Sequence, residues 1–311
     1  MRWVSYVSPL DGREHAGIVV GDEVYGFGDP VTLLDILAVG GSALADAGAV
    51  ARGHPAEVLA VDEVALRAPI AVPPSIRDFM AFENHVVTSM AAIGASVDPV
   101  WYQQPVFYFT NPAAVLGPGE DVPVAPGSVM FDYELEVAAI IGTECRDLEP
   151  ATAERHIAGY TIFCDWSARD LQGVEMRVGL GPAKGKDNAT TMGPWLLTPD
   201  EIEDTRSGNG FALAMTATVN GTAYSSGNLA DLYWSFGEML AYASRGTRLM
   251  PGDVIACGTV GTGCILELAR VHGSDKYPWL KPGDEVRLDV ERMGTLSATI
   301  VPGAPVIPLR P

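Results

Sequence analysis

Three carboxylates alternate along the short stretch FDYELEVAAIIG, residues 131–142: Asp132, Glu134 and Glu136. If this stretch forms a β-strand, every second side chain points to the same face, so the acids lie about 6.5–7 Å apart on one side. Like charges so close together repel one another unless water solvates them or a cation bridges them. The pattern therefore indicates either an exposed edge strand or a metal site.

The residues around these acids favour the metal site. VAAIIG continues the stretch as an apolar, buried strand, so the acids lie beside a core and not in open solvent. Further along, FCDWSARDLQ places Asp165 directly after another apolar run. Carboxylate oxygens without histidine or cysteine suit a hard cation, so the sequence predicts a divalent metal ion. Mg²⁺ is our first expectation, with Mn²⁺ or Ca²⁺ as alternatives.

Five blocks of the sequence follow one another in the order and spacing of a known family. They cover about residues 75–300 and are RDFMAFENHV, YELEVAAIIG, CDWSARDLQ, GPAKGKDNATTMGPW and GDVIACGTVGTGCILEL. In these blocks the chain resembles the fumarylacetoacetate hydrolase family. The resemblance implies a mixed β-roll catalytic domain, a homodimer, and a divalent metal ion that chelates a small 2-oxo acid or β-dicarbonyl substrate.

The resemblance also implies roles for individual residues. The residues that match the family's metal ligands are Glu134, Glu136, Asp165 and Asp78. Those that match substrate-binding positions are Arg169, Gln172 and Thr259. Lys186 would stabilise a developing oxyanion. Asp132 precedes the metal-binding motif, and we expect it to face solvent.

A histidine with a carboxylate partner would supply the catalytic base. His85 lies in the block RDFMAFENHV, where the family carries its catalytic histidine. Some family members place a glutamate three residues after this histidine, but this chain has Thr88 there. Glu267 matches the partner used by the namesake branch, and we favour it over the nearby Glu83. A carboxylate in this role orients the imidazole and stabilises its charged form.

The combined pattern predicts hydrolytic cleavage of a carbon–carbon bond in a β-dicarbonyl or acylpyruvate-type 2-oxo acid, in the setting of aromatic catabolism. A metal ion would bind two substrate oxygens, while the His85–Glu267 dyad removes a proton from water. The same metal chemistry would serve a decarboxylase of oxaloacetate-like acids, or an isomerase or hydratase of 2-hydroxydienoates. A non-catalytic metal-binding protein is the third alternative, and the retention of His85, Lys186, Arg169 and Glu267 argues against it.

Net charge and composition exclude other classes of partner. The chain has 20 Lys and Arg against 39 Asp and Glu, which gives a net charge of −19, and such a surface repels nucleic acid and anionic membranes. No apolar run approaches the roughly 18 residues of a membrane span, and the charged N-terminus does not match a signal peptide. The 4 cysteines form no CxxC pair, as is typical of buried thiols in a reducing compartment, so we expect a cytoplasmic protein.

A glycine-rich run, GTVGTG at 258–263, invites comparison with nucleotide-binding loops. It lacks the Lys-Ser/Thr pair of a P-loop. A dinucleotide site would also need a helix after it, whereas we expect the following CILEL to be a strand. The sequence therefore does not favour nucleotide binding.

The elements that must position these residues divide into a small front piece and a larger remainder. The pattern of apolar and turn residues in 1–67 predicts a small α+β domain. It indicates short strands at 3–7 and 18–26 and a helix broken by Gly40-Gly41. In residues 68–311, turn signals such as MPGD and KPGDE separate short apolar runs. We expect helices there over ATAERHIAGYTIFC and LADLYWSFGEMLAYASRG. The predicted fold class is α+β, mostly β, with the β-roll catalytic domain in the second part.

Overall fold

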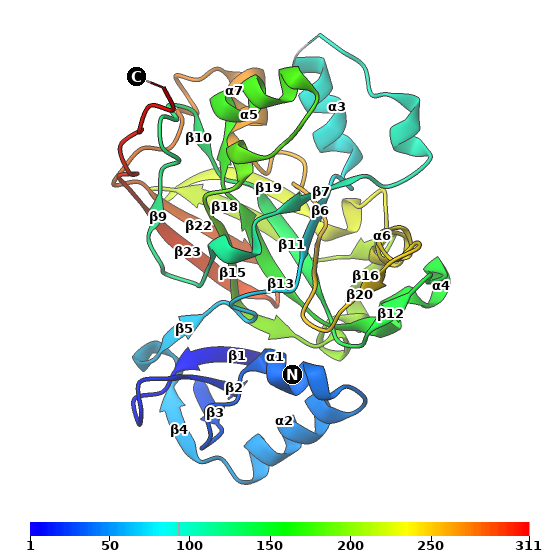
Figure 1. Cartoon of the computed structure of the whole chain (residues 1–311), viewed down its shortest axis with the longest axis vertical. Coiled ribbons are helices and arrows are strands. Elements are labelled where there is room, and N and C mark those ends of the chain that lie inside the picture. The colour runs from blue at the N-terminus through cyan, green and yellow to red at the C-terminus, as the bar shows by residue number, and fades with distance from the viewer. Residues whose placement is uncertain (93, 311) are drawn as a thin grey trace.

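A large mixed sheet forms the centre of the computed structural model, which describes residues 1–92 and 94–310 (Figure 1). Its strands in spatial order are β4 (Glu57–Ala60), β3 (Glu23–Gly26), β2 (Glu14–Val20), β1 (Arg2–Val7), β15 (Thr190–Leu197), β13 (Ile157–Asp165), β11 (Leu135–Ile141), β21 (Val254–Ala256), β6 (Ile76–Phe79) and β7 (Phe107–Thr110). Two further strands pair with β1 and β15 and are β5 (Ala65–Arg67) and β8 (Val115–Leu116).

A second sheet packs against one face of the first. In spatial order it consists of β19 (Thr222–Asn228), β18 (Ala214–Val219), β22 (Glu285–Val290), β23 (Gly294–Val301) and β9 (Val122–Pro123). Leu135 and Val137 of the large sheet share a buried core with Met215, Leu288 and Leu296 of the second sheet. Short strand pairs surround this core and are β10 (Phe131–Asp132) with β14 (Ser167–Ala168), β12 (Cys145–Arg146) with β20 (Arg248–Leu249), and β16 (Arg206–Ser207) with β17 (Gly210–Phe211).

Helices cover the outside of the sheets. The α-helices of the described residues are α1 (Leu33–Val39), α2 (Ala43–Gly53), α3 (Glu83–Ala92), α4 (Pro150–Ala153), α5 (Arg169–Glu175), α6 (Phe236–Ala243) and α7 (Ile265–His272). The break predicted at Gly40-Gly41 is confirmed, because α1 ends directly before it and Gly40 has a φ of +75°. The predicted fold class, α+β with mostly β structure, is also confirmed.

Two element predictions were wrong. The segment ATAERHIAGYTIFC is helical only at its start in α4, and from Ile157 onward it is β13, where β-branched and aromatic residues pair with strands on both sides. CILEL was expected as a strand but begins α7 at Ile265. Its apolar residues recur at helical spacing, with Ile265 and Leu268 buried.

Alternation along the central strands separates their two faces. Odd-numbered residues of β11 from Leu135 to Ile141 face the second sheet, whereas Ala138 and Ile140 face the opposite side. On that opposite side they share a hydrophobic cluster with Phe163 of β13 and Ile76 of β6. This second face is the one on which the acids of the site lie, as described below.

The front piece is joined to the rest through a sheet and a core. β1 pairs with β15, with Trp3 opposite Leu196, so the sheet runs on from residues 1–67 into the larger part. Trp3, Ile18 and Leu33 belong to the same hydrophobic cluster as Ala138. Figure 1 shows the front piece in blue at one end of the long axis of the molecule. The division of the chain after residue 67 stays a prediction.

None of the described helices is long and apolar enough to cross a membrane.

His15, in the front piece, is buried and has a hydrogen-bond partner at each ring nitrogen. His15 Nδ1 bonds to the Phe27 carbonyl oxygen at 2.9 Å, and Nε2 lies 3.2 Å from Asp11 Oδ1. Burial lowers the pKa of His15, but these two partners outweigh it, so the pKa lies above its ordinary value of 6.5. A raised histidine pKa stabilises the fold below the unfolded value and loses this contribution as the pH rises through the folded value.

We therefore expect His15→Asn to lower the melting temperature most near about pH 6, with a difference from the wild type that shrinks toward about pH 8. Thermal unfolding across this range measures it. His54→Asn, at an exposed position, is the matched control and should show no such trend. A difference that is constant with pH would contradict the role of the His15–Asp11 pair.

Candidate active site

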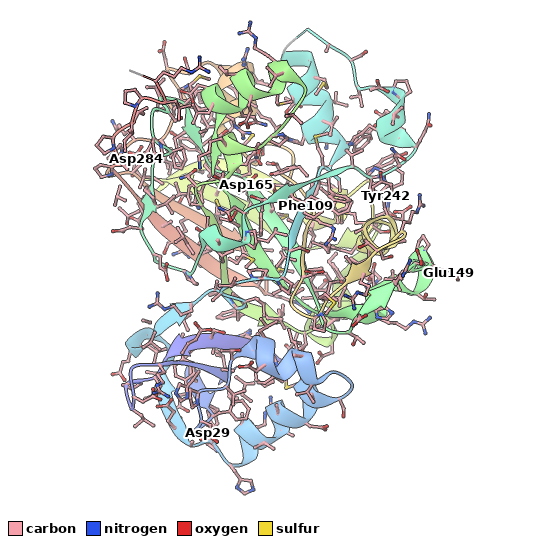
Figure 2. All side chains as sticks on the ribbon, viewed as in Figure 1. Asp29, Phe109, Glu149, Asp165, Tyr242 and Asp284 are labelled. Carbon is pink, nitrogen blue, oxygen red and sulfur yellow. The ribbon has the colours of Figure 1, made fainter. Side chains whose placement is uncertain are left out.

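Four acidic side chains converge on one face of the central sheet. Asp78 stands on β6, Glu136 on β11, Asp165 at the end of β13, and Glu134 directly before β11. Alternate residues of a strand share a face, so the acids lie on the same face as the buried apolar residues two positions away: Ile76, Ala138 and Phe163. This is the face opposite the second sheet. All four acids are buried, with at most 5% of any of them exposed. Asp165 lies inside the larger part of the molecule (Figure 2).

Two buried cations compensate part of this charge. Lys186 Nζ bonds to Asp165 Oδ2 at 2.5 Å and also to Glu134 Oε2. Arg169, the first residue of α5, donates from Nη2 to Glu134 Oε1 at 2.7 Å and from Nη1 to Gln172 Oε1 at 3.3 Å. Glu134 is thus held between two positive groups. Five of the predicted site residues therefore form one connected network.

Asp132 is not solvent-facing, which corrects our expectation. It is fully buried and accepts a hydrogen bond from Arg169 Nε at 2.8 Å. It also accepts from the backbone N–H groups of Ile265 and Leu266 at 2.7 and 3.0 Å, the first two residues of α7. A carboxylate at a helix N-terminus satisfies orphan N–H groups and the helix dipole. This contact also explains why CILEL begins a helix where a strand was expected.

Tyr108 is a site residue that sequence reasoning missed. It stands on β7 directly opposite Asp78 of β6, and its hydroxyl lies 2.7 Å from Asp78 Oδ2 and also bonds to Asp165 Oδ2. A phenol has one hydrogen, so it can donate fully to only one of the two carboxyl groups. The pairing register of FYF with RDF would have revealed Tyr108, but register is not visible in a single sequence.

The glycine-rich loop at 258–263 donates hydrogen bonds to two buried carboxylates. The Gly258 N–H donates to Glu136 Oε2 at 2.9 Å, and Thr259 Oγ1 lies 3.4 Å from Glu136 Oε1. Glycine is required at 258, because its φ is +83° and a Cβ would lie 2.3 Å from the Phe79 carbonyl oxygen. Further along the loop, the Thr262 N–H donates to Glu267 Oε2 at 3.0 Å. One loop thus orients both a predicted metal ligand and the predicted base partner.

A histidine–glutamate pair lies beside these acids. His85 Nδ1 and Glu267 Oε1 are 2.5 Å apart, and both side chains are buried. The pair joins α3 to α7, and Cys264 Sγ lies 3.8 Å from the same glutamate oxygen. The other candidate partner, Glu83, instead accepts a hydrogen bond from the Tyr102 hydroxyl at 2.8 Å. The structure thus brings Glu267, and not Glu83, to the histidine.

The environment pushes the pKa values of the acids apart. Burial, and then the charge of Asp165, raise the pKa of Asp78 well above its ordinary range. Burial and the charge of Asp78 do the same to the pKa of Glu136. Burial raises the pKa of Asp165 to about 6, although Lys186 opposes it. Burial would also raise the pKa of Glu134, but Arg169 and Lys186 outweigh it and hold this pKa below its ordinary value. Divergent pKa values of neighbouring acids are typical of functional sites.

The residues present fit a hard divalent cation. Within the described residues, Asp78 Oδ1 and Asp165 Oδ1 are buried and have no hydrogen-bond partner. Among the described residues, five buried carboxyl groups, Asp132 included, lie around the buried cations Lys186 and Arg169, so acids outnumber cations here. Carboxylate oxygens suit Mg²⁺, Mn²⁺ or Ca²⁺.

The carboxylate oxygens of the four acids are not gathered as closely as the ligands of a bound metal ion. In the described part of the chain, only His85, Cys264 and Glu267 bring three ligand atoms within 4.8 Å of one another. Lys186 Nζ lies between Glu134 and Asp165 and bonds to both. The lysine ammonium therefore neutralises two of the acids to which a cation would bind.

Comparison with known proteins defines the class. The family model described as fumarylacetoacetate (FAA) hydrolase C-terminal matches residues 75–301. The chain therefore belongs to the fumarylacetoacetate hydrolase family, which confirms the resemblance of the five sequence blocks. The family and its hydrolase members indicate an enzyme.

Individual relatives extend this result. A Burkholderia multivorans protein named "Putative hydrolase" is 34% identical over 193 residues, 62% of this chain and 64% of that protein. The match thus spans less than two thirds of the relative's length. The fumarylacetoacetate hydrolase of Exiguobacterium antarcticum is 27% identical, with a TM-score of 0.70 over 97% of this chain and 99% of that one.

A third comparison shows the fold alone. The maleylpyruvate hydrolase of a Sphingobium species, solved in complex with manganese(II) ion and pyruvate, is 23% identical to this chain. Its TM-score is 0.72, over 98% of this chain and 100% of that one. The front piece is therefore included in the shared fold, together with the part that the family model matches.

Asp132 should contribute strongly to stability. Asp132→Ala removes the cap of α7 and one partner of buried Arg169, so we expect the free energy of unfolding to fall by roughly 2–4 kcal/mol. Asp132→Asn should cost less, because the amide oxygen still accepts from a helix N–H. Urea unfolding measures both changes. The exposed Asp121→Ala is the control and should stay within about 0.5 kcal/mol of the wild type. An equally small effect at Asp132 would sink the capping role.

Proposed function

We propose that the chain is a divalent-metal-dependent hydrolase that cleaves a carbon–carbon bond in a β-dicarbonyl or acylpyruvate-type 2-oxo acid. The observation that carries the proposal is the buried His85–Glu267 pair beside a carboxylate cluster with unpartnered oxygens. The His85–Glu267 pair supplies a base that can take a proton from water, and the carboxylate cluster supplies ligands for a cation. The loop at 258–263 donates to Glu136 from Gly258 and to Glu267 from Thr262, so one loop supports both parts. The two halves therefore serve one site.

His85 is the group that activates water. Glu267 faces Nδ1, and the Thr262 N–H holds the other oxygen of Glu267, so the carboxylate is fixed on both sides. With Nδ1–H donating to Glu267, Nε2 is free to take a proton from water. The negative partner stabilises the imidazolium that results. Proton removal and histidine orientation thus come from two helices, α3 and α7.

The carboxylate cluster would hold the cation. Asp78, Glu134, Glu136 and Asp165 are the ligands that the proposal assigns, and Mg²⁺, Mn²⁺ and Ca²⁺ all suit them. When bound, such an ion polarises substrate oxygens as a Lewis acid. The chain itself contributes the negative charge, the burial and the hydrogen bonds that keep the carboxylates in place. The manganese complex of the Sphingobium hydrolase belongs to that protein and agrees with this choice of ligand chemistry.

Lys186 and Arg169 would bind the anionic parts of the substrate and the oxyanion that forms from it. A cavity of about 500 Å³ opens beside Lys186 and is lined by Phe109, Thr110, Asn111, Ala183, Lys184 and Asp187. Its size suits a small metabolite. Donors aimed at a developing oxyanion commonly contribute roughly 3–4 kcal/mol to catalysis. Gln172, bonded to Arg169, and Thr259, bonded to Glu136, are the further substrate contacts in this proposal.

We also propose that the enzyme acts in the cytoplasm as a homodimer.

The dyad is tested by replacing each partner. His85→Ala should reduce turnover of an acylpyruvate by about 10²–10⁴-fold, because a positioned general base contributes that much. Mn²⁺ affinity should change little, because no assigned ligand is removed. Glu267→Gln should reduce turnover less severely. Glu83→Gln, on the same helix as His85 but bonded to Tyr102, is the matched control and should retain activity.

The same experiment separates hydrolysis from its closest rivals. In a decarboxylase or isomerase that relies on the metal-held enolate, no water needs activation. His85→Ala would then keep more than about a tenth of wild-type turnover on oxaloacetate or on a 2-hydroxydienoate. That result would overturn the hydrolase proposal in favour of one of these reactions.

The metal site is tested by removing a ligand. Glu136→Gln should weaken Mn²⁺ binding and abolish turnover together, because the amide carries no negative charge for the cation. Electron paramagnetic resonance of free Mn²⁺ measures the affinity directly. Glu149→Gln, an exposed acid outside the cluster, is the control and should bind Mn²⁺ as the wild type does. Unchanged affinity in Glu136→Gln would remove this residue from the ligand set.

A further inference from the structure

Two acids of the cluster share one hydrogen-bond partner. Asp78 and Asp165 each direct Oδ2 to the hydroxyl of Tyr108. Each also has a buried Oδ1 without a hydrogen-bond partner among the described residues. Buried carboxylate oxygens are normally satisfied, so a matched pair of exceptions calls for an explanation. The unpartnered atoms are the ones that Tyr108 does not touch.

The surroundings of Tyr108 hold its ring in place. β7 pairs with β6 in register, with Tyr108 opposite Asp78 and Phe107 opposite Phe79. Lys186 Nζ lies 5.7 Å from the centre of the Tyr108 ring, over its face. Two residues further along β7, Thr110 Oγ1 donates to the backbone carbonyl oxygen of Lys186 at 3.0 Å. The phenol is therefore fixed from the strand side and from the lysine side.

We propose that Tyr108 is a positioning residue for the divalent cation: its one hydroxyl hydrogen, shared between Oδ2 of Asp78 and Oδ2 of Asp165, clamps both atoms, so that each acid presents Oδ1 as its ligand atom. This inference rests on the proposed metal dependence and adds to it a residue outside the ligand set. Phenylalanine would fill the same space without the clamp. Asp78 would then lose the hydrogen bond to its Oδ2, and Asp165 would keep only the bond from Lys186, so the ligand atoms would be less well preorganised. Hydrogen bonds to ligating carboxylates contribute to metal affinity in this way.

The test compares Mn²⁺ binding by Tyr108→Phe and by the wild type, with electron paramagnetic resonance of free Mn²⁺ as the readout. We expect the Kd for Mn²⁺ to rise about 10–100-fold, as is common when a hydrogen bond to a ligand is lost. Tyr102→Phe is the matched control, since its hydroxyl bonds to Glu83 outside the cluster. The control should bind Mn²⁺ with the wild-type Kd. A Tyr108→Phe Kd within about threefold of the wild type would overturn the clamp.

A spectroscopic readout distinguishes the clamp from a general structural role. When Mn²⁺ binds, the hydrogen bonds of the Tyr108 hydroxyl change, so the wild type and Tyr102→Phe should show a tyrosine absorption difference that saturates with one equivalent of metal. If Tyr108→Phe does not fold, this wild-type signal still decides, and its absence overturns the proposal. If the wild type binds no Mn²⁺ at all, the proposed metal dependence fails as well. If the wild type binds Mn²⁺ and the tyrosine signal and Kd are insensitive to Tyr108, only the clamp fails.

Discussion

The burial of five carboxyl groups beside the central sheet is the constraint on which the rest of the site depends. Asp78, Asp132, Glu134, Glu136 and Asp165 are all at most 5% exposed. Ionised carboxylates are expensive to remove from water unless they are paired, hydrogen-bonded or metal-bound. The structure accordingly surrounds them with several kinds of hydrogen-bond donor: a lysine, an arginine, a tyrosine, a threonine and backbone N–H groups. The excess of acids over cations is what makes the site suited to a divalent ion.

These donors also connect the acids to the His85–Glu267 pair. Asp132 caps α7, and α7 carries Glu267. The loop at 258–263 donates to Glu136 from its first residue and to Glu267 from Thr262. The position of Glu267 is therefore set by the same helix and loop that donate hydrogen bonds to the buried acids. The acids and the His85–Glu267 pair thus share one helix and one loop.

Two errors of the sequence-based reasoning have a common cause. Asp132 was expected at the surface and CILEL as a strand, and both expectations considered each segment by itself. In the folded chain the two segments meet, and the carboxylate of one satisfies the N–H groups of the other. Tyr108 was overlooked for a similar reason: its importance comes from its register opposite Asp78, which a single strand sequence does not show.

The sequence by itself determined the family, the fold class and the identity of the metal-binding and catalytic candidates. These follow from residue types at short spacing, such as Glu134 and Glu136 in one strand, and from the order of blocks along the chain. Only the tertiary structure decided which partners these residues have. It placed Glu267 and not Glu83 beside His85, buried Asp132 against α7, and set Tyr108 between two acids. Such pairings join residues far apart in the chain, and they are set by strand register and helix packing, which local sequence patterns do not encode.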